Sequence, residues 1–252
     1  MSELVRVYVW EWPVRVTHWL IALSIAVLSV SGLYIGHPFV MVSGPAGEHF
    51  VMGTTKVVHF YAAIVFTLAV LARLVWMFIG NSYARWDKFL PARRKRVAGI
   101  LPTLKFYLFA LRKPPGFIGH NPVAGLAYVG VFLLYFLEIA TGFTLYAADA
   151  HVGSPMRSFV ALAPFLGGLA TARWTHHVIM WLLLGFAVHH VYSAILMSQV
   201  EANATMESIF SGYKFVPRED VVYSEKLPPG GTLTIAHEQP AGKHEGRRAR
   251  GR

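Results

Sequence analysis

The sequence of 252 residues contains no cysteine. This absence excludes a disulfide framework, an iron–sulfur cluster held by cysteine thiolates, and a covalently attached c-type haem, which needs a C-x-x-C-H motif. Histidine, by contrast, occurs 12 times. If the chain carries electrons, we therefore expect histidine side chains to hold the carrier.

Charged residues are scarce as well. Asp, Glu, Lys and Arg make up 14% of the sequence and apolar residues 55%, whereas soluble domains contain about 25% charged residues. The composition therefore predicts an integral membrane protein. We interpret the formal net charge of +10 as a property of loops that face the cytoplasm and anionic lipid, not as a sign of nucleic-acid binding.

Four apolar stretches are long enough to cross a bilayer, which takes about 20 helical residues. They predict membrane spans at about 14–35, 56–79, 122–146 and 174–199. We therefore expect an all-α bundle of four transmembrane helices within residues 1–202, with haems between the helices. Residues 203–252 are expected to form a cytoplasmic tail, and the polar composition beyond about residue 227 predicts disorder.

The loop between the second and third spans gives the orientation. Between Gly80 and Asn121 it carries nine basic residues and only one acidic residue, Asp87. Basic loops remain in the cytoplasm, so this loop and both termini are expected there. The other two connections contain few Lys or Arg residues and are expected outside. The basic residues of the loop are Arg85, Lys88, Arg93, Arg94, Lys95, Arg96, Lys105, Arg112 and Lys113.

The last span contains two histidine pairs, His176-His177 and His189-His190. Only His176 and His190 are fourteen residues, or two heptads, apart. In a bundle helix they fall on one face, about 21 Å apart at about 1.5 Å per residue. This spacing suits two haems stacked across a membrane.

The predicted topology supplies a partner for each of these two histidines. The second and fourth spans both begin outside, so His59 and His176 share a level near the outer face. The first span begins inside, so His18 and His190 share an inner level. Each pair therefore predicts two axial imidazole ligands to the iron of a b-type haem. A transporter that binds metal ions or protons through intramembrane histidines is an alternative, but it does not require matched depths.

Other polar residues in the spans have weaker assignments. His177 and His189 lie off the ligand face and are expected to form interhelical hydrogen bonds. Arg73, fourteen residues after His59, either neutralises a propionate of the inner haem or extends to the membrane surface. Glu138 has three candidate roles, as a proton-linked group, a partner of an outer histidine, or an interfacial carboxylate, and we expect the last.

Small residues inside the spans leave two interpretations open. Gly32, Gly142 and Gly185 permit either close approach of neighbouring helices or room for a porphyrin. His120 stands beside Asn121 at the inner end of the third span, where a functional role and simple solvent exposure are both open.

Several segments distributed over all four spans resemble the b-type cytochrome subunit of membrane-bound nickel–iron uptake hydrogenases. The resemblance covers about residues 5–215. The family is also similar in helix plan to the cytochrome b subunits of formate dehydrogenase and thiosulfate reductase. The segments are PVRVTHW, KVVHFYAA, GHNPVAGLAY, TGFTLYA, and HHVYSAILMS followed by SGYK.

The resemblance implies an electron-transfer subunit of a hydrogen:quinone oxidoreductase complex in the bacterial cytoplasmic membrane, not a hydrogenase by itself. Such a subunit anchors the small and large hydrogenase subunits at the outer face and passes electrons from the iron–sulfur clusters of the small subunit to quinone. The family's haem histidines fall on His18, His59, His176 and His190, which gives two haem b groups.

Electrons are then expected to enter at the His59/His176 haem and to leave through the His18/His190 haem. The resemblance to formate dehydrogenase suggests a quinone site near His120 and Asn121, with Arg112 and Lys113 nearby. Two close alternatives are a cytochrome b subunit of a formate dehydrogenase-like complex and a free-standing quinone-linked cytochrome of the b561 kind.

Overall fold

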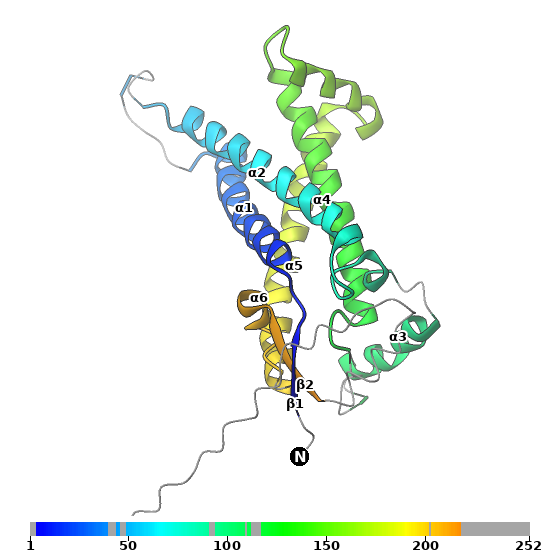
Figure 1. The fold of residues 1–252 in the computed structure, drawn as a ribbon. Coiled ribbons are helices and arrows are strands. Elements are labelled where there is room, and N and C mark those ends of the chain that lie inside the picture. The colour runs from blue at the N-terminus through cyan, green and yellow to red at the C-terminus, as the bar shows by residue number, and fades with distance from the viewer. Residues whose placement is uncertain are drawn as a thin grey trace, which may run out of the picture.

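The computed structural model describes residues 4–39, 44–45, 49–90, 94–108, 110–111, 117–201 and 203–217. Four helices in these ranges are long and apolar enough to cross a membrane (Figure 1), which confirms the predicted fold class. Arg112, Lys113 and the expected disordered tail beyond residue 227 lie outside the described residues. The four helices are α1 Trp12–Gly36, α2 Val51–Ile79, α4 Pro122–Asp149 and α5 Leu169–Glu201.

Proline marks the first turn of α1 and of α4. Proline lacks an amide hydrogen, but no intrahelical acceptor exists at that position. At α4 the preceding Asn121 also caps the helix, because its side-chain oxygen accepts a hydrogen bond from the backbone nitrogen of Ala124 at 2.8 Å. Both helices therefore start where the local sequence indicates.

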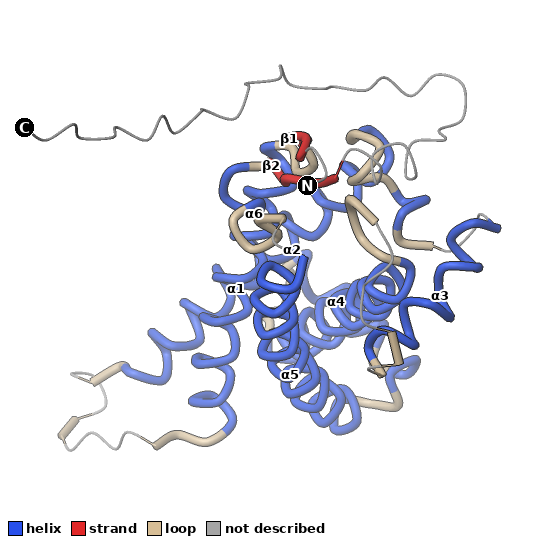
Figure 2. Tube along the Cα trace, turned by 90° about the horizontal axis from the view of Figure 1, so that it is seen from below, coloured by secondary structure: helices blue, strands red, loops and turns tan. Residues whose placement is uncertain are grey.

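The four long helices form two antiparallel hairpins, α1 with α2 and α4 with α5 (Figures 1 and 2). Apolar side chains from all four helices meet at mid-height and hold the hairpins together. The side chains that face outward are also apolar, as lipid requires. The central cluster consists of Ile21, Phe66, Ala69, Val70, Val131, Tyr135, Ile179 and Leu183.

A two-stranded antiparallel sheet closes one end of the bundle, which we call the sheet end (Figure 1). Strand β1, Leu4–Tyr8, pairs with β2, Tyr213–Pro217, in a register that places Val5 opposite Val216. A short helix α6, Ser208–Ser211, precedes β2. The sheet was not predicted, although the alternation in LVRVY is typical of a half-buried strand.

Glu11 ties the start of α1 to the end of α2 at the sheet end. Its Oε2 atom accepts hydrogen bonds from Nε1 of Trp76 and from the backbone nitrogen of Asn81, both at 2.8 Å. The side chain of Asn81 in turn donates to the carbonyl of Val9 at 3.0 Å. The connection to α4 contains η1, Trp86–Lys88, and α3, Arg94–Tyr107, and the connection to α5 contains η2, Pro155–Leu162, and η3, Pro164–Leu166.

Candidate functional site

The four histidines singled out by spacing and depth come together as two pairs. The ring centroids of His59 on α2 and His176 on α5 lie 6.5 Å apart, toward the end opposite the sheet. Those of His18 on α1 and His190 on α5 lie 6.2 Å apart, toward the sheet end. Because α5 is one continuous helix, its two histidines are about 21 Å apart along the axis.

These separations suit two imidazoles on opposite sides of one metal ion. With metal–nitrogen bonds of about 2 Å and ring radii of about 1.1 Å, such imidazoles have centroids about 6.2 Å apart. The four side chains therefore fit the bis-histidine ligation of a b-type haem at each level.

The ring of His59 is oriented by the neighbouring helix α1. The Nδ1 atom of His59 lies 2.9 Å from Oγ of Ser31. The hydroxyl hydrogen of Ser31 is donated to the carbonyl of Val27 at 2.6 Å, so Oγ accepts from Nδ1–H. This hydrogen bond fixes the tautomer and leaves Nε2 of His59 free to bind a metal.

The ring of His176 is held in the same way from α4, with one addition. Its Nδ1 atom lies 3.0 Å from Oγ1 of Thr141, whose hydroxyl donates to the carbonyl of Leu137 at 2.8 Å. Oε1 of Glu138 lies 3.3 Å from the same Nδ1 atom. The side chain of Glu138 is only 16% exposed, so the expected role as an interfacial carboxylate is wrong and the structure supports the partner role.

The pair at the sheet end has a different environment. Nδ1 of His190 lies 3.2 Å from the phenolic oxygen of Tyr128 on α4. Nδ1 of His18 is buried and has no hydrogen-bond partner among the residues that the structure describes. A carboxylate therefore approaches a paired histidine at one level, and a phenol does so at the other.

Two of the three glycines lie against the His59/His176 pair. A Cβ atom at Gly32 would lie 3.3 Å from Cε1 of His59, and one at Gly142 would lie 3.2 Å from Cε1 of His176. In both helices the glycine follows the hydroxyl residue that bonds the same ring. Gly185 has no such contact, because a Cβ there would meet no described atom within 4 Å.

His177 and His189 stay away from both pairs. Nδ1 of His177 lies 2.8 Å from the carbonyl oxygen of Arg173, one turn earlier in α5. Because a carbonyl oxygen can only accept, Nδ1–H is the donor. His189 is exposed and lies 3.4 Å from Oγ of Ser193 on the same helix. Their hydrogen bonds to described residues are within α5, whereas interhelical hydrogen bonds were expected, although the ring of His177 also lies against Gly36 of α1.

Arg73 is buried near the sheet end, with 7% of its surface exposed. Its guanidinium donates to the carbonyl of Ala84 at 3.3 and 3.4 Å and lies 5.4 Å from the ring centroid of Phe89. The side chain thus reaches from α2 into the connection that follows. These contacts use part of its donor capacity, since a guanidinium has five N–H groups.

His120 lies among aromatic rings below the His18/His190 pair. Its ring centroid is 4.9 Å from that of Trp10, 5.3 Å from Phe89 and 4.6 Å from Tyr128. Tyr128 in turn contacts His190. A continuous series of rings therefore leads from the ligand pair to the sheet end.

Positive charge surrounds this imidazole. Burial lowers the pKa of His120 well below its ordinary value, and the neighbouring Arg73, Lys214 and Arg96 lower it further. Burial also lowers the pKa of Lys214, which is 5% exposed and lies over the Trp10 ring. His120 is therefore neutral near pH 7.

Asn121 has mainly structural contacts. Besides capping α4, it donates from Nδ2 to the hydroxyl of Tyr107 at 2.8 Å. Arg96 donates to the carbonyl of His120 at 3.2 Å. These bonds attach α3 and its connections to the start of α4.

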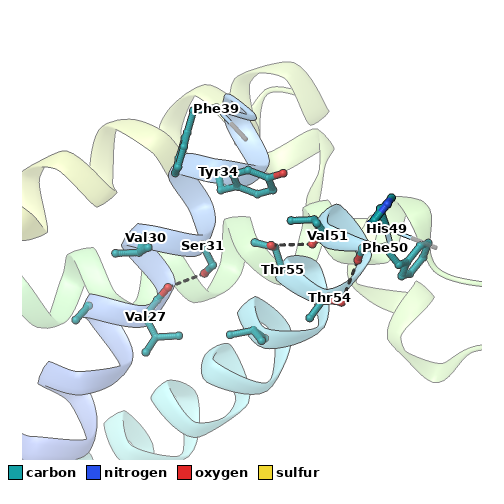
Figure 3. Close-up of a pocket in the computed structure, with 12 residues that line it drawn as sticks. Val27, Val30, Ser31, Tyr34, Phe39, His49, Phe50, Val51, Thr54 and Thr55 are labelled. Atoms are coloured by element: carbon teal, nitrogen blue, oxygen red, sulfur yellow. Dashed lines mark hydrogen bonds between the residues drawn. The ribbon is translucent and has the colours of Figure 1, made fainter. Parts of the chain in front are cut away.

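An open groove of about 870 Å³ lies between α1 and α2 at the end opposite the sheet (Figure 3). Its lining is mostly apolar, with hydroxyl groups from Ser31, Thr54 and Thr55. Ser31 joins it to the His59 ring. None of the four paired histidines lines this groove.

Three hydroxyl residues that orient the ligand histidines were not predicted: Ser31, Thr141 and Tyr128. The serine and the threonine each directly precede a glycine within an apolar helix. The repeated pattern of a hydroxyl residue followed by glycine was the available signal. The pattern does not show which histidine each hydroxyl contacts until the rotation of the helices is known.

Comparison with known proteins gives one matching family model, described as prokaryotic cytochrome b561, over residues 9–212. This match includes all four long helices and all four paired histidines.

Curated relatives cover most of the chain. A protein of Escherichia coli (strain K12) named "Probable Ni/Fe-hydrogenase 1 B-type cytochrome subunit" is 38% identical over 218 residues, which are 84% of this chain and 92% of the relative. Proteins named "Probable Ni/Fe-hydrogenase B-type cytochrome subunit" are similar in Cupriavidus necator, at 35% identity with 82% and 86% covered, and in Rhizobium leguminosarum bv. viciae, at 33% with 86% and 93% covered.

Proposed function

Because this chain belongs to the prokaryotic cytochrome b561 family and brings four helix-borne histidines together as two pairs, we propose that it is the dihaem membrane anchor of a nickel–iron hydrogenase, passing electrons to quinone. The observation that carries this proposal is the separation of 6.2 and 6.5 Å between the ring centroids of the two pairs.

The protein supplies the ligands, and haem b supplies a one-electron carrier that cycles between ferric and ferrous iron. His59 and His176 would hold one haem, and His18 and His190 would hold the other. Two histidines per haem would leave no place for oxygen or substrate to bind, which suits electron transfer. Ser31, Thr141 and Tyr128 orient their histidines, and the apolar cluster at mid-height excludes water between the two levels.

The orientation follows the distribution of charge. The connection between α2 and α4 is rich in Lys and Arg, so the sheet end faces the cytoplasm and both termini lie there. The His59/His176 pair then faces the periplasm, where it receives electrons from the iron–sulfur clusters of the hydrogenase small subunit. The names of the relatives support this association.

Quinone is reduced near the sheet end, next to the His18/His190 pair. His120 and Asn121 are the candidate polar groups there, and the neutral state of His120 allows its ring to accept or donate a hydrogen bond. Arg73, which is buried at the same level, would neutralise a haem propionate. Quinone would take up cytoplasmic protons in this region.

Substitution of His190 by Ala tests the proposal in the intact hydrogenase complex. One of two haems should be lost by pyridine haemochrome quantification. Hydrogen-dependent quinone reduction should stop, while hydrogen oxidation with an artificial acceptor should continue. The exposed His189, substituted in the same way, is the matched control and should retain both haems. Two haems in the His190→Ala protein would refute the assignment.

A further inference from the structure

The two hairpins orient His59 and His176 with one repeated arrangement. On α1, Ser31 bonds the His59 ring and Gly32 leaves room for it. On α4, Thr141 bonds the His176 ring and Gly142 leaves room for it. In each case the hydroxyl donates to its own helix and accepts from Nδ1–H.

The two arrangements differ by one acidic residue. Three residues before Thr141 stands Glu138, whereas three residues before Ser31 stands Leu28. Oε1 of Glu138 lies 3.3 Å from Nδ1 of His176. Only one of the two histidines at this level therefore has a carboxylate beside it.

Among the residues that the structure describes, no other polar contact of the Glu138 side chain explains its place in an apolar helix. Its Oε2 atom is buried and has no hydrogen-bond partner in the described part of the chain. A buried acceptor without a partner destabilises the fold, and a charged one does so more strongly. A side chain kept at such a cost within a membrane span indicates a function.

The sheet-end pair lacks a comparable group. His190 has the neutral phenol of Tyr128 at its Nδ1 atom, and the Nδ1 atom of His18 has no described partner. Among the described residues, the two levels therefore differ by one carboxyl group close to a proposed ligand ring, and this group carries a negative charge when it is ionised. In a poorly solvated site, a charge at this distance acts strongly because solvent screening is weak.

We propose that Glu138 is a positioning residue that lowers the reduction potential of the haem bound by His59 and His176 relative to the haem bound by His18 and His190. An ionised carboxylate close to Nδ1–H would make the imidazole more electron-donating and would favour ferric over ferrous iron, because the ferric state carries one more positive charge. This inference rests on the proposed function. As a consequence, transfer of one electron from the haem of His59 and His176 to the haem of His18 and His190, toward the sheet end, is favourable in free energy.

A redox titration of the purified full-length holoprotein, followed by the α-band absorbance, measures both midpoint potentials. In Glu138→Gln, the lower potential should rise by at least a tenfold change in the one-electron equilibrium, or about 59 mV, while the higher potential stays constant. Glu138→Leu, which reproduces the residue found on α1, should give a rise at least as large. Tyr128→Phe is the matched control, because it should shift only the other haem.

The same titration in a His190→Ala background assigns each potential to a haem. In that background only the haem held by His59 and His176 should remain. An unchanged or lowered potential in Glu138→Gln, or an equal shift of both haems, would overturn the inference and leave the proposed function intact. If the wild-type protein itself binds fewer than two haems, the proposed function fails instead. Glu138→Gln preserves the shape of the side chain, so loss of folding is not expected to obscure the result.

Discussion

Thr141 accepts a hydrogen bond from His176 across the interface between α4 and α5, and it can do so because its own hydroxyl hydrogen is already donated one turn back along α4. The threonine therefore functions as a pure acceptor for Nδ1–H. Its role is to hold the imidazole in one tautomer and one orientation.

Replacement of Thr141 by Val should weaken haem binding at this level. The substitution keeps the shape but removes the acceptor, and loss of such an outer partner costs about 10- to 100-fold in metal affinity. Haem content per protein, measured by pyridine haemochrome after mild washing, should fall toward one. Thr141→Ser retains the hydroxyl and should keep two haems; equal haem loss in both variants would contradict this account.

Alanine at Gly142 should have a different effect from alanine at Gly185. At Gly142 the new methyl group would lie 3.2 Å from Cε1 of His176, a ring held by its hydrogen bond, so haem retention should decrease. At Gly185 the methyl group meets open space, and helix propensity favours Ala over Gly by about 1 kcal/mol. Haem content and apparent melting temperature of the two variants test this contrast; a loss of haem in Gly185→Ala would count against it.

The sequence predicted the helices and the pairing of the four histidines because both follow from fixed geometry. Bilayer thickness sets the length of a span, and a rise of about 1.5 Å per residue places His176 and His190 at two depths. The charge of the loops then determined which of His18 and His59 shares each depth. These steps require no knowledge of how side chains pack.

The environment of the ligands could not be predicted in this way. Whether Glu138 turns toward His176 or toward the membrane surface depends on the rotation of α4, which is set by packing against three other helices. The pairing of Val5 with Val216 joins segments about 200 residues apart in sequence, and a five-residue strand carries too little pattern to specify its partner. Both features depend on the assembled bundle.

Stability should decrease as the pH falls below about 6.5, the ordinary pKa of histidine, and His120 should contribute to this decrease. The pKa of His120 is lowered in the folded protein. Between this lowered pKa and the ordinary pKa of about 6.5, the unfolded chain therefore binds a proton that the folded chain does not. The stability it contributes is therefore present above the unfolded pKa and is lost as the pH falls toward the folded pKa.

The apparent melting temperature in detergent, compared between pH 8 and pH 5, measures this effect. His120→Phe keeps a ring against Trp10 and Tyr128 but cannot titrate, so its melting temperature should depend less on pH than that of the wild type. An identical pH dependence in both proteins would show that His120 is already free to protonate in the fold.

Removal of the carboxylate of Glu11 should destabilise the sheet end. Two donors, Trp76 Nε1 and the backbone nitrogen of Asn81, would each lose a bond of 2.8 Å to a charged acceptor, and bonds of this kind contribute about 1.5–3 kcal/mol each. Glu11→Ala should lower the apparent melting temperature and increase proteolysis after residue 80. Glu11→Gln, which retains one acceptor oxygen, should have a smaller effect. A larger effect than that of Glu11→Ala would contradict the role of these two hydrogen bonds.

The pairing of β1 with β2 also affects the order of biosynthesis. His18 is on the first long helix, and its partner His190 is on the last, while β1 has no strand to pair with until Tyr213–Pro217 has left the ribosome. At about 5–20 residues per second, the first helix is held without its partner for about ten seconds or more. The site at the sheet end is thus completed only after Tyr213–Pro217 has been synthesised, and the proposed haem would be captured there only from that point on.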